Sequence, residues 1–102
     1  MKSITIDKIK SWKNNSQPFS VVTAYDYTSA KIINDSDVSI ILVGDSASMV
    51  SYGYSTTIPI EMNELLLITR AVSRAAKNSF VVGDMPFMSY QVSAARAIKN
   101  AG

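Results

Sequence analysis

The sequence predicts an α/β fold in which one helix precedes three strand-plus-helix units of a parallel sheet. Two observations predict this fold. Short apolar runs rich in β-branched residues recur along the chain, and segments with apolar residues at helical intervals alternate with them. The 102 residues are 47% hydrophobic and 18% charged, which places the chain among globular proteins with one small core. Regular alternation favours parallel strands with helices packed outside them.

The leading helix and the first unit occupy the first third of the chain. A helix is expected over residues 5–15, where apolar residues recur at helical spacing and Thr5 suits the helix start. Turn residues follow, and then a strand is expected over residues 19–24, which are rich in β-branched side chains. A second helix is expected over residues 25–34.

The second and third units follow the same plan. The nearly uninterrupted apolar run at 39–45 indicates a strand buried on both faces, as in a parallel sheet. The Ser-, Gly-, Tyr- and Thr-rich segment 46–59 is long for a connection, and such loops are often functional, either as a mobile cover or as a fixed surface excursion. A helix is expected over 61–77, a strand over 79–84 and a helix over 91–101.

Three such units do not close into a complete architecture. A (β/α)8 barrel needs roughly 250 residues. An open parallel sheet of three strands would leave two apolar edges uncovered. We therefore expect residues 1–102 to be a truncated part of a longer protein.

Composition limits the chemistry available to the chain. The net charge is +2 with no block of like charge, so neither a nucleic-acid partner nor a membrane surface is expected. No apolar run of signal-peptide or transmembrane length is present, and a cytoplasmic location is expected. The chain contains no Cys and no His. Carboxylates, hydroxyls, Lys and Tyr must carry any chemistry, and an oxygen-only ligand set favours Mg²⁺.

Three aspartates mark the ends of the three expected strands, at Asp26, Asp45 and Asp84. Active sites of barrel enzymes are assembled at this end of the strands. The alternative is that each aspartate caps the helix that follows it. Tyr25 and Asp26 could touch a substrate pocket from the first strand, but helix capping is favoured for Asp26 and a buried packing role with a satisfied hydroxyl for Tyr25. Two carboxylates that converge repel each other unless a cation lies between them, so Asp45 and Asp84 are the candidate ligands of a hard divalent metal.

Four segments at the strand ends carry a family resemblance. They are 23–27 (Thr-Ala-Tyr-Asp-Tyr), 42–46 (Leu-Val-Gly-Asp-Ser), 57–59 (Thr-Ile-Pro) and 84–90 (Asp-Met-Pro-Phe-Met-Ser-Tyr). In order and spacing they resemble the amino-terminal motifs of the ketopantoate hydroxymethyltransferase family, and the resemblance spans essentially all 102 residues. The second and fourth segments are specific only in combination.

The resemblance implies a homo-oligomeric (β/α)8 TIM barrel, of which residues 1–102 would be the amino-terminal part of a single, incomplete domain. It implies transfer of a hydroxymethyl group from 5,10-methylenetetrahydrofolate to 3-methyl-2-oxobutanoate, giving 2-dehydropantoate. This is the first step of pantothenate and coenzyme A biosynthesis. The expected partners are the small keto acid, the folate co-substrate and further copies of the protein.

The resemblance also implies residue roles. Asp45 and Asp84 would be ligands of one Mg²⁺ per subunit, and Asp45, Ser46 and Asp84 would bind the keto acid, whose carboxylate the backbone and hydroxyl at Ser46 would hold. A metal chelated by the keto acid stabilises an enolate. The family's substrate-binding lysine, its third acidic ligand and its glutamate base are expected beyond Gly102. No catalytic residue is assigned in this chain, and the 102 residues alone are expected to be inactive.

The chain departs from the family at three positions. Ser48 stands where the family usually has glycine, Ser55 where it has aspartate, and Ile68 where it has histidine. Two other functions stay open. One is a Mg²⁺-dependent 2-oxo acid lyase of the phosphoenolpyruvate mutase and isocitrate lyase type, and the other is a non-catalytic remnant that docks on a full-length homologue.

Overall fold

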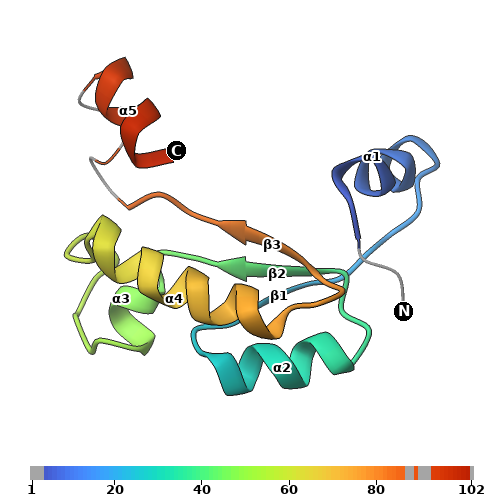
Figure 1. The fold of residues 1–102 in the computed structure, drawn as a ribbon, viewed down its shortest axis with the longest axis horizontal. Helices are drawn as coiled ribbons and strands as arrows, with labels where there is room; N and C mark the ends of the chain where they lie inside the picture. The colour runs from blue at the N-terminus through green and yellow to red at the C-terminus, as the bar shows by residue number, and fades with distance from the viewer. Residues whose placement is uncertain (1–3, 87–88, 90–92, 102) are drawn as a thin grey trace.

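The structure is a computed structural model that describes residues 4–86, 89 and 93–101. Helices and strands alternate along these residues, as the sequence predicts (Figure 1). The elements are α1 (Ile6–Asn14), β1 (Val21–Thr23), α2 (Tyr27–Asp35), β2 (Ile40–Val43), α3 (Ala47–Val50), α4 (Met62–Ala75), β3 (Phe80–Gly83) and α5 (Ala94–Ala101).

The three strands form one parallel sheet in the order β1-β2-β3. The register aligns Val21 with Ile40 and Ile40 with Phe80, so the strands begin level with one another. Helix α1 lies toward the ends where the strands begin, called here the amino edge, and α5 lies toward the ends where they finish, the carboxyl edge (Figure 1). The predicted α/β fold with three parallel strands alternating with helices is confirmed.

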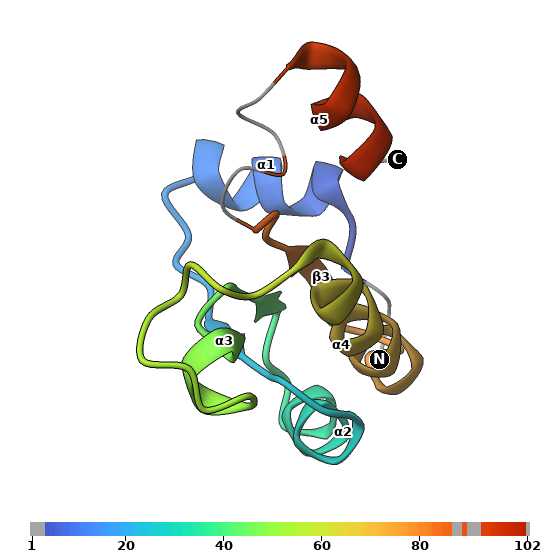
Figure 2. The ribbon, with the colours of Figure 1, turned by 90° about the vertical axis from the view of Figure 1, so that its left-hand side faces the viewer.

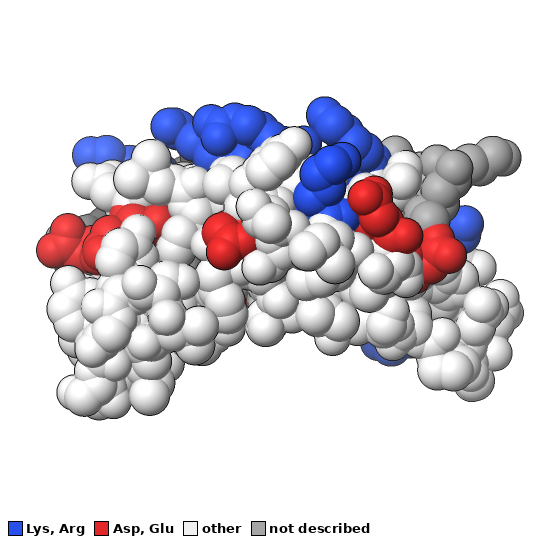
Figure 3. Space-filling model, turned by 90° about the horizontal axis from the view of Figure 1, so that it is seen from below, with Lys and Arg blue, Asp and Glu red and all other residues white. Residues whose placement is uncertain are grey.

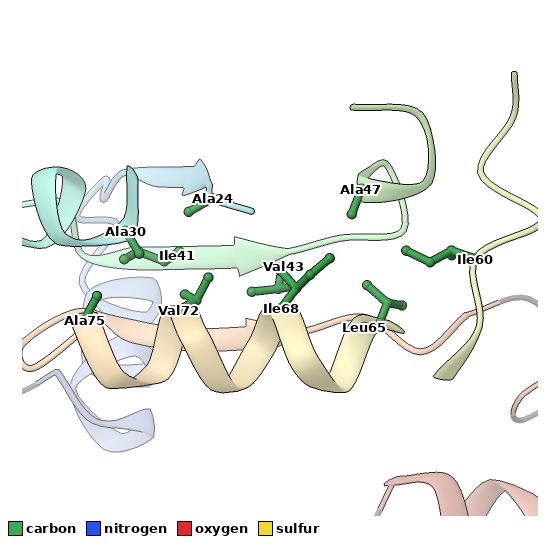
Figure 4. Packing of buried hydrophobic residues seen from close by; sticks show 10 residues of the cluster. All are labelled: Ala24, Ala30, Ile41, Val43, Ala47, Ile60, Leu65, Ile68, Val72 and Ala75. Atoms are coloured by element: carbon green, nitrogen blue, oxygen red, sulfur yellow. The ribbon is translucent and has the colours of Figure 1, made fainter. Parts of the chain in front are cut away.

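Helices α2 and α4 pack side by side on one face of the sheet, and the opposite face has no helix laid along it among the described residues (Figures 1 and 2). The core lies between these helices and β2 (Figure 4). Helix α4 contributes a stripe at intervals of three and four residues, the spacing of an amphipathic helix. The buried apolar residues of this cluster are Ala24, Ala30, Ile41, Val43, Ala47, Ile60, Leu65, Ile68, Val72 and Ala75.

Two helices begin at polar residues that the sequence marks as caps. The Lys8 N–H donates to Thr5 Oγ1 at 3.3 Å at the start of α1, as expected. The Ser29 N–H donates to Asp26 Oδ1 at 2.7 Å at the start of α2. A capping side chain accepts hydrogen bonds from N–H groups that have no partner inside the helix. The helix-capping role expected for Asp26 is therefore confirmed.

The structure differs from the sequence expectation in segment 46–59, which contains the short helix α3. Four residues are too few to give a helical repeat of apolar positions, so the pattern could not reveal this helix. The helix expected over 61–77 spans Met62–Ala75, and the last helix begins at Ala94. Residues 91–92 of that expected helix lie outside the described residues.

Charged side chains occupy part of the outer surface of the helical layer. Figure 3 shows this face with Lys and Arg gathered along one margin and Asp and Glu spread across the middle. Arg70 and Arg74 are exposed on α4, one turn apart, opposite the stripe that enters the core. None of the described helices is both long enough and apolar enough to pass through a lipid bilayer.

Candidate metal and substrate site at the carboxyl edge

The sheet register brings Gly44 and Asp84 together just beyond the strands. Val43 is paired with Gly83, and the Asp84 N–H donates to Val43 O at 2.8 Å. Successive residues of a strand face opposite sides of the sheet. Because Val43 is buried under α4, the next position on each strand faces the side that α2 and α4 leave uncovered. Gly44 and Asp84 therefore share the open face.

Gly44 leaves space between two polar side chains. A Cβ atom placed on Gly44 would lie 3.4 Å from Asp84 Oδ2 and 3.6 Å from Ser46 Oγ. The carboxylate of Asp84 and the hydroxyl of Ser46 therefore border the same point above the Gly44 backbone. A glycine at such a position permits a ligand to approach the main chain.

Asp45 and Asp84 line one depression of about 380 Å³, together with Gly83 and Met85. Asp45 is half-buried and Asp84 is exposed. Among the described residues, neither carboxylate accepts a hydrogen bond. The structure thus places the two aspartates that the sequence singles out on the same depression.

Asp26 lies apart from this pair. It is fully exposed, and the hydrogen bond from the Ser29 backbone lowers the pKa of its carboxyl group. It lines a different depression, of about 450 Å³, which Tyr25 and Ser51 also border. Asp26 therefore caps helix α2 and does not line the depression that Asp45 and Asp84 share.

Ser46 occupies the position before α3, where serine side chains often cap a helix, but its hydroxyl makes no capping bond. Instead, Ser46 Oγ and the Tyr25 hydroxyl share a hydrogen bond of 2.5 Å. Both residues are half-buried. The sequence predicts only a packing role with a satisfied hydroxyl for Tyr25, and its contact with Ser46 was missed. The one available signal was its place at the end of the first strand.

The segment after α3 is tied to that helix by Ser48. The buried Ser48 hydroxyl donates to Thr56 O at 2.8 Å, and Ser48 O accepts from the Tyr54 N–H at 2.9 Å. A serine where the resemblance leads one to expect glycine is thus accommodated by an extra hydrogen bond. Ile68 is buried in the core, where an apolar side chain fits. Nothing in the structure explains Ser55.

The residues at the carboxyl edge fit a hard divalent cation. Their donors are carboxylate and hydroxyl oxygens, the ligands that Mg²⁺ prefers. Within the part of the chain that the structure describes, no group of three His, Cys, Asp or Glu side chains could hold a metal. Asp45 and Asp84 would therefore supply part of a coordination shell, and water or substrate oxygens would complete it.

The fold and the site together define a class: a parallel α/β protein whose acidic side chains meet at the carboxyl edge of the sheet, where proteins of this architecture bind their ligands. The comparison of sequences names the family. The sequence profile of the ketopantoate hydroxymethyltransferase family matches residues 3–102. The chain belongs to this family.

Curated relatives agree with this assignment. The chain is 50% identical over 98 residues to a protein of Clostridium novyi (strain NT) named 3-methyl-2-oxobutanoate hydroxymethyltransferase. The aligned residues make up 96% of the chain and 36% of that relative. The chain is 49% identical over 102 residues to the protein of the same name from Staphylothermus marinus, covering 100% of the chain and 37% of the relative. The chain thus spans a little over a third of the length of these relatives.

Proposed function

We propose that the chain forms the metal-binding part of a (β/α)8 barrel that transfers a hydroxymethyl group from 5,10-methylenetetrahydrofolate to 3-methyl-2-oxobutanoate. The observation that carries the proposal is the depression shared by Asp45 and Asp84, whose carboxylates accept no hydrogen bond from the described residues. Two free carboxylates on one depression repel each other, and a bound cation relieves that repulsion. The match to the family over residues 3–102 supplies the reaction.

Each residue of the site has a task in this proposal. Asp45 and Asp84 hold Mg²⁺, which supplies Lewis acidity toward the ketone of the substrate and so makes its C3 proton easier to remove. The Ser46 hydroxyl donates a hydrogen bond to the carboxylate of the keto acid. Gly44 leaves the space that the substrate enters, because any side chain there would lie between Asp84 and Ser46.

The uncovered face of the sheet supports the proposal that further strands complete a barrel. Val21 and Val82 lie on this face, because each pairs with a β2 residue next to the buried Ile41, and they are 51% and 38% exposed. Apolar strand surface of this kind is normally covered in the folded protein. The general base and the remaining polar contacts then come from the rest of the barrel. Assembly of the complete protein into a homo-oligomer is part of the same proposal.

The test uses the completed chain, defined here as this sequence joined to the unmatched remainder of the Clostridium novyi relative. Purified completed chain is assayed with 3-methyl-2-oxobutanoate, 5,10-methylenetetrahydrofolate and Mg²⁺. We expect 2-dehydropantoate to form, with the intact relative as a positive control and the 102-residue chain alone inactive. A folded completed chain that forms no 2-dehydropantoate would contradict the proposal, and cleavage of C–C bonds in 2-oxo acids without the folate would indicate a lyase instead.

A further inference from the structure

The hydrogen bond between Tyr25 and Ser46 joins two residues that lie on successive strand ends. Tyr25 follows β1, and Ser46 lies between β2 and α3. Their hydroxyl oxygens are 2.5 Å apart, and both side chains are half-buried. The Ser46 side chain makes no capping hydrogen bond to helix α3, although its position would allow one. The orientation of its hydroxyl is therefore set by Tyr25 and not by the helix.

The Tyr25 and Ser46 pair has one hydroxyl hydrogen to donate to another group. Two hydroxyls carry two protons, and one of them lies within the shared hydrogen bond. A phenol is a more acidic donor than an aliphatic alcohol, so the tyrosine proton is the one that the pair uses internally. The serine proton then stays available for a third group. Donation from Tyr25 also polarises the Ser46 hydroxyl and strengthens the bond it gives in turn.

The Ser46 hydroxyl, whose hydrogen is available for donation, lies beside the proposed site. Ser46 Oγ is 3.6 Å from the position that a Gly44 Cβ would take, which Asp84 Oδ2 approaches at 3.4 Å. An acceptor placed above Gly44 is therefore within reach of Ser46 and next to a metal-binding carboxylate. A 2-oxo acid bound to a metal on Asp84 would place its own carboxylate at this point, within reach of the Ser46 hydroxyl and next to the Asp84 side chain.

We propose that Tyr25 is a positioning residue that orients the Ser46 hydroxyl to donate to the carboxylate of the 2-oxo acid. The proposal rests on the proposed function and adds a specific role for the first strand. Tyr25 acts through Ser46 and touches neither the metal nor the reacting carbon. Its loss is therefore expected to weaken substrate binding more than the chemical step.

The test compares Tyr25→Phe with Ser46→Ala and with the double variant in the completed chain. Tyr25→Phe keeps the ring and removes the hydroxyl. We expect a KM for the keto acid about tenfold higher with kcat within about twofold, since an oriented hydrogen bond to a charged group is lost. In the Ser46→Ala background the same change is expected to have no further effect. Tyr27→Phe, at an exposed tyrosine of α2, is the matched control.

Calorimetry of 3-methyl-2-oxobutanoate binding in the presence of Mg²⁺ gives a second readout that does not depend on turnover. An unchanged KM and an unchanged dissociation constant in a folded Tyr25→Phe variant would overturn the proposal while the proposed function stands. An equal loss with and without the Ser46 hydroxyl would also overturn it, because Tyr25 would then act independently. A completed chain that neither binds nor converts the keto acid would contradict both proposals.

Discussion

The two edges of the sheet use polar side chains in different ways. At the amino edge, the buried Asn34 side-chain oxygen accepts hydrogen bonds from the backbone N–H groups of Asn78 at 2.9 Å and Ser79 at 3.1 Å. At the carboxyl edge, Asp45 and Asp84 border one depression and accept no hydrogen bond from the described residues. One edge uses its polar groups to join α2 to β3, whereas the other leaves its carboxylates available.

The difference separates residues that stabilise the fold from residues that bind. A buried polar group that pairs with backbone lowers the free energy of the folded state, and removing it leaves buried N–H groups without partners. Two nearby carboxylates without partners repel each other and stabilise nothing until a cation binds. Substitutions at the two edges should therefore give opposite signatures: loss of stability at the amino edge and loss of binding at the carboxyl edge.

The largest expected effect is on metal binding at the carboxyl edge. Asp45→Asn in the completed chain removes one of the two anionic ligands that residues 1–102 supply, and we expect Mn²⁺, used as a spectroscopic substitute for Mg²⁺, to bind at least about 100-fold more weakly. Thermal stability without metal should stay the same or rise, since the repulsion is relieved. Electron paramagnetic resonance and thermal melts measure the two quantities. Undiminished Mn²⁺ binding would remove Asp45 from the site.

The largest expected loss of stability is at the amino edge. Asn34→Ala leaves the N–H groups of Asn78 and Ser79 without their acceptor, which should lower the free energy of unfolding by about 2–4 kcal/mol. Denaturant unfolding of the completed chain measures this. Asn63→Ala, at an exposed position of α4, is the control and should change little. Mn²⁺ affinity of folded Asn34→Ala should match the unsubstituted protein, and a matching loss of both properties would break the contrast between the edges.

A smaller effect on binding is expected from Gly44→Ala. The added methyl makes ordinary contacts, so stability should change by less than about 1 kcal/mol, but it occupies the space between Asp84 and Ser46. We expect the keto acid to bind about tenfold more weakly by calorimetry. Ser73→Ala, at an exposed position of α4 that does not line this depression, is the control. Equal weakening by both changes would show that the space above Gly44 has no special role.

The smallest effect concerns Asp26 and pH. The Ser29 hydrogen bond holds the pKa of the folded Asp26 below its ordinary value of 3.8. The charged form is therefore favoured in the folded state, and the contribution of Asp26 to stability is present above the unfolded pKa and lost as pH falls through the folded one. Below about pH 4, the melting temperature of Asp26→Asn should therefore fall slightly less with decreasing pH than that of the unsubstituted protein. An unchanged pH profile would contradict the assigned capping role.

The sequence predicts the elements well where the information is local. Apolar spacing along the chain is enough to find β2 and α4, because each buries a continuous run or stripe of its own residues. The pairing of Asp45 with Asp84 is also predictable, since parallel strands of similar length finish at one edge. The elements are therefore predicted from patterns within single segments, and the pairing of the two aspartates follows once the strands are taken to be parallel.

The remaining features depend on contacts between segments, and these leave no mark in local spacing. The Tyr25 and Ser46 hydroxyls meet only because β1 and β2 are in register. Likewise, the Ser48 bond to Thr56 O depends on how segment 46–59 folds back over α3. The sequence marks Asn34 only as a residue near the end of a helix, and its role depends on the hydrogen bonds it accepts from the two residues before β3. Polar side chains whose partners are distant in sequence are the ones that sequence reasoning misses.

The most direct test of the central claim is hydrogen–deuterium exchange at C3 of 3-methyl-2-oxobutanoate, followed by nuclear magnetic resonance. The completed chain is compared with Asp84→Asn and with Asp26→Asn, the strand-end aspartate that only caps a helix. We predict Mg²⁺-dependent exchange in the unsubstituted protein and in Asp26→Asn, and none above background in Asp84→Asn. Exchange retained in folded Asp84→Asn would contradict the account of the carboxyl edge as a metal and substrate site.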